Sequence, residues 1–239
     1  MARETSAGAP SRSLVQRMKR LYRYYFKNPP KVKKSIRLNV ERHGTEYGGW
    51  NIVADSLSIE SIVYSFGIGE DVSFDLSLIK KYGCPVIGFD PTPRVGQWLK
   101  DHVDEPRFRF FPIGLSNTDG TLTFYEPLDP NFVSHTSVDL GNSTKLDVPC
   151  KRLKSCMEML GHAKIDLLKM DIEGFEYDVV ADIIRDGLRP TQLLIEFHHF
   201  FPQYGRETTE QSIQTLEKYG YRLFDISDSF CEYSFLWKG

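Results

Sequence analysis

Short apolar runs alternate with helix-like segments from about residue 61 to 220, and several runs end in glycine or an acid. In the clearest case, the apolar run 167–170 is followed by an acidic turn around Gly174, and apolar residues then return at helical spacing. This alternation predicts a mostly parallel sheet covered by helices on both faces. Ligands of such sheets bind at the carboxyl ends of the strands, so Asp171 and Glu173 are expected at a ligand edge.

The pattern predicts one α/β domain over residues 38–239, because 239 residues with 41% hydrophobic content suit a single sizeable core. A closing pair of strands follows the last helix and reads as an antiparallel hairpin. We therefore expect a seven-stranded sheet with strands at 61–66, 84–90, 107–114, 165–171, 191–199, 221–226 and 230–237.

Residues 1–37 form a basic arm with eleven Lys or Arg and one acid, whereas the remainder has 19 basic and 31 acidic residues. Within the arm, residues 13–27 have the spacing of an amphipathic helix. One interpretation is an anionic membrane surface bound through residues 12–34, and the other is a helix docked on the domain or a solvated leader. No specific nucleic-acid partner is predicted.

The sequence has no run of eighteen apolar residues and no apolar core of a secretory signal. We therefore expect a cytoplasmic protein, with the basic arm as the candidate for peripheral membrane contact. The four cysteines include no C-x-x-C pair, so a structural zinc site is not predicted.

A glycine turn follows the first strand of the alternating region, as a nucleotide-binding loop requires. Gly67 and Gly69 permit close approach to a ligand, whereas Glu70 and Asp71 would repel a pyrophosphate. This disfavours a nicotinamide-dependent reductase and favours a ligand with a positive centre. Asp90 ends the next strand, 21 residues after Gly69, at the spacing of a carboxylate that binds ribose hydroxyls.

Four motifs together resemble the FkbM family of methyltransferases over roughly residues 40–239. They are Phe66-Gly67-Ile68-Gly69-Glu70-Asp71, Gly88-Phe89-Asp90-Pro91, Pro112-Ile113-Gly114-Leu115-Ser116 and Leu168-Lys169-Met170-Asp171-Ile172-Glu173-Gly174-Phe175-Glu176. The resemblance implies a Rossmann-like class I methyltransferase fold, S-adenosylmethionine as methyl donor, and O-methylation of a hydroxyl on a sugar or natural-product-like molecule. Asp71 departs from the pattern, since many methyltransferases have a third glycine there.

The positive sulfonium of S-adenosylmethionine is compatible with the acidic glycine turn. With the resemblance, this assigns the cofactor contacts to Phe66, Gly67, Gly69, Asp71, Asp90, Pro91, Ser116 and Asp171.

A methyltransferase mainly positions its reactants and excludes water, and a general base helps when the acceptor is an alcohol. The candidates for this base are His198, then Glu173, then His199, because each follows the carboxyl end of a strand. Asp171 is expected to orient the cofactor or the acceptor. A divalent ion on Asp171 and Glu173 is conceivable, but the sequence offers no third ligand and we predict no metal.

Polar residues around a glycine-rich segment are candidates for binding a small hydroxyl acceptor. They are His43, Glu46 and Tyr47, with His199 as a further contact. The alternative is a structural cap over the sheet with Trp50 in the core. The polar segment 131–144 is expected to cover the site. A non-catalytic Rossmann-like binding module, tethered by its basic arm, is the remaining functional alternative.

Overall fold

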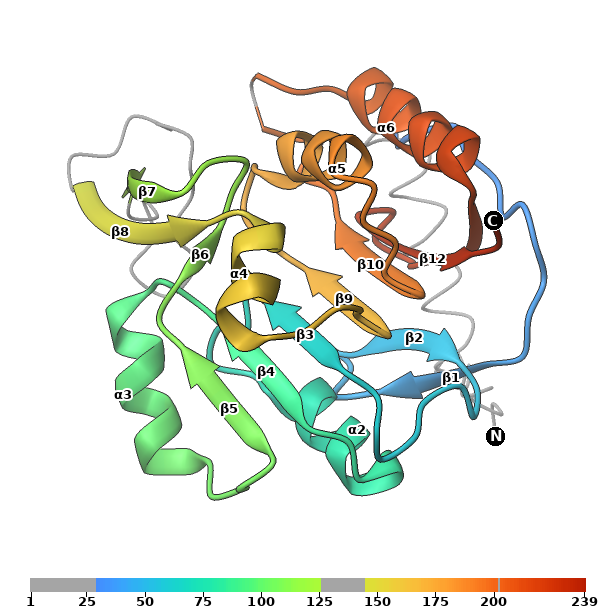
Figure 1. Ribbon diagram of the computed structural model, residues 1–239. Coiled ribbons are helices and arrows are strands. Elements are labelled where there is room, and N and C mark those ends of the chain that lie inside the picture. Colours follow the sequence, from blue (N-terminus) through green and yellow to red (C-terminus); the bar gives the residue numbers. More distant parts are fainter. Residues whose placement is uncertain (1–28, 126–144, 202) are drawn as a thin grey trace, which may run out of the picture.

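The computed structural model describes residues 29–125, 145–201 and 203–239, and a seven-stranded sheet is its centre (Figure 1). The strand order is β11-β12-β10-β9-β3-β4-β5. The strands are β3 (Val63–Phe66), β4 (Val86–Phe89), β5 (Phe108–Phe111), β9 (Leu167–Met170), β10 (Gln192–Glu196), β11 (Tyr221–Ile226) and β12 (Glu232–Trp237). Strand β12 is antiparallel to both of its neighbours, and the other pairs are parallel. The predicted sheet and its closing antiparallel pair are confirmed.

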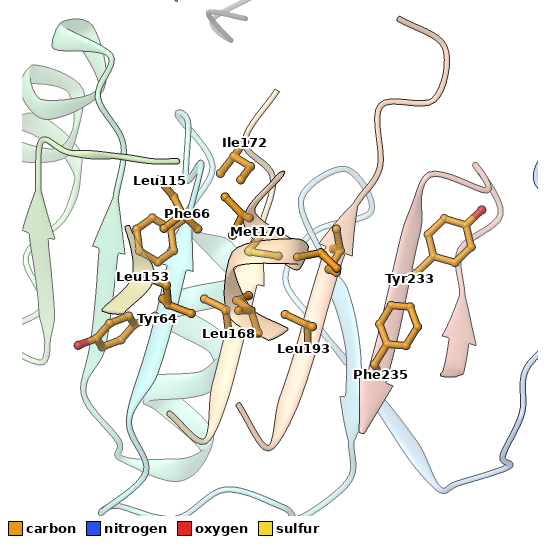
Figure 2. Packing of buried hydrophobic residues seen from close by; sticks show 14 of the residues in the cluster. Tyr64, Phe66, Leu115, Leu153, Leu168, Met170, Ile172, Leu193, Tyr233 and Phe235 are labelled. Atoms are coloured by element: carbon orange, nitrogen blue, oxygen red, sulfur yellow. The ribbon is translucent and has the colours of Figure 1, made fainter. Parts of the chain in front are cut away.

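Helices cover both faces of this sheet. Neighbouring residues of a strand point to opposite faces, and apolar strand residues on both faces are buried beneath these helices. The helices are α2 (Ser73–Tyr82), α3 (Pro93–His102), α4 (Leu153–Leu160), α5 (Glu176–Arg185) and α6 (Arg206–Tyr219). Figure 2 shows Phe66, Met170 and Leu193 meeting in the core that α4, α5 and α6 cover. The intervening residues Leu167 and Leu194 pack with α2 on the opposite face.

Two smaller sheets flank the main one. Strands β1 (Val40–His43) and β2 (Trp50–Val53) form an antiparallel hairpin, where the sequence indicated only a glycine-rich cap. Trp50 is buried in the core with α2, as that interpretation required. Strands β6 (Gly114–Leu115), β7 (Gly120–Tyr125) and β8 (Lys145–Lys151) form the second small sheet.

The described end of the basic arm packs along the outer edge of β11. The Ser35 backbone N–H donates to the Leu223 carbonyl at 2.8 Å, and the Leu223 N–H donates to Ser35 Oγ at 2.8 Å. The Lys31 N–H also donates to Glu210 of α6 at 2.7 Å. The predicted helix at 13–27 and the segment 131–144 lie outside the described residues. Within the described part of the chain, no helix is both long enough and apolar enough to cross a membrane.

Candidate active site

A cleft of about 1200 Å³ lies at the carboxyl ends of the parallel strands. It is lined by residues 46–51, 66–71, 89–92, 113–115, 171–173 and 225–229, together with Lys34, Arg42, Phe124, Lys169, Glu196, Glu232 and Ser234. Every predicted cofactor residue except Ser116 is in this set. The site therefore joins the glycine turn after β3, the acid after β4 and the acidic turn after β9.

The glycine turn fits closely against the acidic turn. Gly67 has φ +70°, and a β-carbon placed on it would lie 1.6 Å from the Asp171 carbonyl oxygen. Its N–H donates to the Phe89 carbonyl at 2.9 Å, and its own carbonyl accepts from Lys169 Nζ at 2.7 Å. A side chain at position 67 would force the two turns apart. Gly69 also has a positive φ, +55°, but space surrounds it.

Lys169 is a buried cation beneath the glycine turn, and sequence reasoning did not assign it a role. It lies on the sheet face opposite Met170, and 6% of it is exposed. Asp75 of α2 is buried on the same face, and burial raises its pKa to about 6 although the Lys169 charge acts against the shift. Lys169 thus compensates buried negative charge while it holds the Gly67 carbonyl.

The acids at the expected cofactor edge, which we define as the glycine turn 67–71 and Asp90, all have partners. Asp90 is buried and accepts from the Gly69 N–H at 3.0 Å and the Thr92 N–H at 2.9 Å. Glu70 binds Arg94 through two hydrogen bonds of 2.8 and 3.0 Å. This edge is a preformed cradle in which backbone donors and a cation fix the orientation of the acids.

Asp71 is also held by its neighbours. It accepts from Thr45 Oγ1 at 2.7 Å and from the Ser73 N–H at 2.9 Å. Burial alone would raise the pKa of Asp71, but the hydrogen bonds from Ser73 and Thr45 outweigh burial and lower it. The missing third glycine is therefore replaced by a residue that ties the turn to the segment after β1.

The acidic turn after β9 has a strained backbone. Glu173 has φ +52°, in the left-handed region that costs a residue with a side chain about 1–3 kcal/mol. The fully buried Glu176 accepts from the Ile172 N–H at 3.1 Å and from the Gly174 N–H at 3.1 and 3.3 Å. Tyr204 donates to the Gly174 carbonyl at 2.7 Å. These bonds hold Glu173 on the cleft wall.

His198 lies behind the acidic turn and is 3% exposed. Its Nδ1 is 2.8 Å from Glu176 Oε1, and its Nε2 is 3.2 Å from Glu173 Oε2 and 3.8 Å from Asp171 Oδ1. Burial acts to lower the pKa of His198, but Glu176 and Glu173 raise it well above the usual value. Both ring nitrogens therefore face carboxylates, and these carboxylates favour the protonated form of the ring. It does not line the cleft.

Three carboxylates form a row across neighbouring strands. Glu196 of β10 is directly opposite Glu232 of β12, and Asp171 directly follows Met170, which pairs with Ile195. Burial, and then the Glu173 charge among other causes, raises the pKa of Asp171 to about 7. Burial, followed by Asp171 and Glu232, raises the pKa of Glu196 well above the usual value. We call Asp171, Glu196 and Glu232 the carboxylate row.

Glu196 changes the assessment of a metal site. Among the described residues, Asp171, Glu196 and His198 each place one ligand atom within 4.8 Å of the others. Sequence reasoning found no third ligand beside Asp171 and Glu173. Glu196 lies in the carboxyl-terminal part of the predicted strand 191–199, so its position was a usable signal, but only strand order shows that it neighbours Asp171.

Two predicted site residues serve local structure instead of lining the cleft. His43 is buried, with Nδ1 2.8 Å from Ser77 Oγ and Nε2 2.9 Å from Glu41 Oε1. Ser116 is buried, and its Oγ donates to the Thr118 carbonyl at 2.6 Å. Their hydrogen-bonding groups are thus engaged in a hairpin–helix contact and in a turn.

Of the remaining predicted acceptor contacts, Glu46 and Tyr47 line the cleft, whereas His199 does not. Tyr47 is 89% exposed, so it stands at the mouth. His199 Nδ1 is buried without a hydrogen-bond partner among the described residues, and burial lowers its pKa.

A family model described as "Methyltransferase FkbM domain" matches residues 52–223, most of the chain. The chain belongs to the FkbM methyltransferase family. The resemblance of the four motifs is confirmed, and the cofactor of this family is S-adenosylmethionine. The fold and family are those of an S-adenosylmethionine-dependent methyltransferase, which replaces the nicotinamide alternative.

Two curated proteins are similar in sequence. "Probable methyltransferase-like protein 24" of Rattus norvegicus is 28% identical over 173 residues, and that of Homo sapiens is 26% identical over 174 residues. Each match covers 68% of this FkbM-family chain but only 42% and 41% of the relatives. The match thus spans less than half the length of these relatives.

Solved structures with a similar fold include methyltransferase FkbM from Methylobacillus flagellatus, with a TM-score of 0.48 and 12% identity over 76% of this chain and 44% of that one. Fibrillarin of Aeropyrum pernix, in complex with natively bound S-adenosyl-L-methionine, has a TM-score of 0.42 and 16% identity over 77% and 68%.

Proposed function

We propose that this chain transfers a methyl group from S-adenosylmethionine to a hydroxyl of a small molecule of the sugar or natural-product kind. The observation that carries the proposal is the position of Asp171. Its carboxylate lies in the cleft where the glycine turn meets the carboxylate row, and its pKa of about 7 suits a general base at neutral pH.

The cofactor edge fits S-adenosylmethionine. Gly67 and Gly69 allow close approach of the ligand, and the Asp90 carboxylate retains lone pairs for ribose hydroxyls beside its two backbone donors. Asp171 and Glu173 present negative charge toward the cleft and would face the sulfonium. When bound, S-adenosylmethionine supplies an activated methyl carbon.

Asp171 would accept the proton of the acceptor hydroxyl while the oxygen forms its bond to the methyl carbon. The carbon–sulfur bond breaks, its electron pair returns to sulfur, and S-adenosylhomocysteine remains. The close fit of the two turns supports an arrangement in which base and donor lie side by side, so positioning would supply most of the catalysis.

His198 and Glu173 support Asp171 in this proposal. A base must offer a lone pair, and both nitrogens of His198 face carboxylates at 2.8 and 3.2 Å. We therefore move His198 from its first place among the candidate bases to a positioning role. Its positive charge holds Glu173, and together they set the field around Asp171.

The test is methyl transfer with defined acceptors. The protein is incubated with methyl-labelled S-adenosylmethionine and a panel of sugars and polyols, and S-adenosylhomocysteine release is measured. The linkage in the product is then read by NMR. A methyl group on oxygen supports the proposal, and transfer only to nitrogen or carbon contradicts it. The binding of the basic arm, residues 1–37, to an anionic membrane surface and the cytoplasmic location of the protein stay predictions.

A further inference from the structure

The carboxylate row concentrates negative charge on the wall of the cleft that begins beside the glycine turn and continues across the ends of β9, β10 and β12. Glu196 and Glu232 lie opposite each other on antiparallel strands, where like charges are unfavourable. Asp171 extends the row, because it follows Met170, which pairs with Ile195 next to Glu196. A bound cation would remove this repulsion.

The cations of the cleft wall are engaged elsewhere. Among the described lining residues these are Lys34, Arg42 and Lys169. Lys34 binds Asp225, and Arg42 donates to the backbone carbonyls of residues 45 and 46, each at 3.2 Å. Lys169 is held by the Gly67 carbonyl. No cation of this wall has an ion pair with Glu196 or Glu232.

The same wall carries neutral hydrogen-bonding groups. Ser227 and Ser229 both donate to Glu232, and Ser234 donates to the Asn51 carbonyl at 3.1 Å. Each hydroxyl oxygen keeps lone pairs that can accept hydrogen bonds from a ligand. Alternating hydroxyl and carboxylate groups match a molecule with several hydroxyls and at least one cationic group.

We infer that the acceptor is a polyhydroxylated molecule that carries a protonated amine, with an amino sugar as the simplest class. This inference rests on the proposed function and names its substrate class. The amine would lie against Glu196 and Glu232, while a neighbouring hydroxyl points to Asp171. Acceptors with phosphate or carboxylate groups would be repelled by the row.

An amine fits the row better than a divalent metal ion does. The Nε2 of His198, which belongs to the three groups that could share one ion, already lies 3.2 Å from Glu173 Oε2. The row also continues through Glu232, which is not in the set of three groups that could share one ion. An extended row suits a ligand with several donor groups.

The experiment compares kanamycin, a sugar with several amines, with its fully N-acetylated form, which has the same skeleton without the charges. Binding to the full chain saturated with S-adenosylhomocysteine is measured by calorimetry. We expect kanamycin to bind at least about tenfold more tightly than the acetylated form, since hydrogen bonds between charged groups are strong. Glu196→Gln and Glu232→Gln should each weaken kanamycin binding by about tenfold.

Glu158→Gln, an exposed charge on α4, is the matched control and should leave kanamycin binding unchanged. Equal binding of the two sugars, or equal losses in all three variants, would overturn the inference. Binding of Mn²⁺ alone that Glu196→Gln abolishes, together with no preference for kanamycin, would assign the row to a metal ion and also overturn it. These measurements do not depend on which atom is methylated, so O-methylation can fail separately.

Discussion

The two halves of the cleft handle negative charge differently. At the cofactor edge, each acid has nearby donors: Glu70 binds Arg94, Asp71 binds Thr45, and Asp90 accepts two backbone N–H groups. At the edge that we propose for the acceptor, Glu232 accepts from two serine hydroxyls, but Glu196 and Glu232 oppose each other with no ion pair to a cation of the described cleft wall. The charges of the first half are thus held by the protein, whereas a bound cation would relieve the repulsion in the second.

This difference predicts where stability and function oppose each other. Substitutions at the cofactor edge remove groups that hold the fold, so stability and binding should fall together. Substitutions that neutralise the carboxylate row remove repulsion, so stability should rise while function is lost.

The largest effect is expected from Gly67→Ala. The added methyl would lie 1.6 Å from the Asp171 carbonyl oxygen, a backbone atom that cannot move without the acidic turn. We expect loss of measurable S-adenosylhomocysteine binding, and a decrease of more than about 2 kcal/mol in the free energy of unfolding. Calorimetry and thermal melting measure the two effects.

Gly69→Ala is the matched control. Its φ is also positive, +55°, but no atom lies within 4 Å of the added carbon. We expect only the conformational cost of about 1 kcal/mol. Equal effects at both positions would show that backbone conformation, and not contact with the acidic turn, makes Gly67 necessary.

The same contrast explains what the sequence could predict. The cofactor edge consists of short contiguous motifs at strand ends, so Gly67, Asp71 and Asp90 were placed in the cleft from the sequence alone. The acceptor edge is made by strand pairing. Glu232 neighbours Glu196 because β12 inserts between β10 and β11, and no local pattern shows that insertion.

Orientation was the second limit. His198 was expected at a strand end near Asp171, and it lies there, but its direction depends on the fully buried Glu176. That glutamate was visible only as part of a motif. His43 and Ser116 do not line the cleft for a similar reason, since residues 41, 77 and 118 form hydrogen bonds with their polar groups.

The next largest effect is expected from Asp171→Asn. An amide cannot accept the proton of the acceptor, so turnover should fall by about 10²–10⁴-fold, while the affinity for S-adenosylhomocysteine changes little. Asp178→Asn, an exposed acid on α5, is the control and should retain turnover. Retained turnover in Asp171→Asn would assign the base to another residue.

The stability of Asp171→Asn should change in the opposite direction. The pKa of Asp171 is about 7 in the folded protein and about 3.9 in an unfolded chain. Between these values the folded state keeps a proton that the unfolded state releases, so the free energy of unfolding falls as pH rises. A pKa difference of about three units corresponds to about 4 kcal/mol, so at pH 8 the variant should be more stable than wild type by up to this amount, and near pH 4 about equal. Melting curves at both pH values measure this, and a pH-independent difference would contradict it.

Asp90→Ala should have an intermediate effect at the cofactor edge. The variant loses the carboxylate for the ribose hydroxyls and the acceptor of the Gly69 and Thr92 N–H groups. Loss of a charge-assisted hydrogen bond of about 1.5–3 kcal/mol predicts S-adenosylhomocysteine binding weaker by about ten- to 150-fold. Unchanged affinity by calorimetry would remove Asp90 from the cofactor site.

The smallest effects are expected where ion pairs are half exposed, and they compare the two edges directly. Arg94, which binds Glu70, has a side chain that is 49% exposed, and Lys34, which binds Asp225, is 42% exposed. Exposed pairs contribute less than about 1 kcal/mol, so Arg94→Ala should alter stability and cofactor affinity only slightly. In Lys34→Ala the buried Asp225 keeps, among the residues that the structure describes, the Asn51 amide at 2.6 Å as its side-chain partner, so we expect the larger loss there. Thermal melting at low and at high salt distinguishes the two ion pairs. Salt screening should abolish the loss of stability in Arg94→Ala but leave part of the loss in Lys34→Ala. If both variants lost the same stability and high salt abolished both losses, Asp225 would be as well hydrated as Glu70.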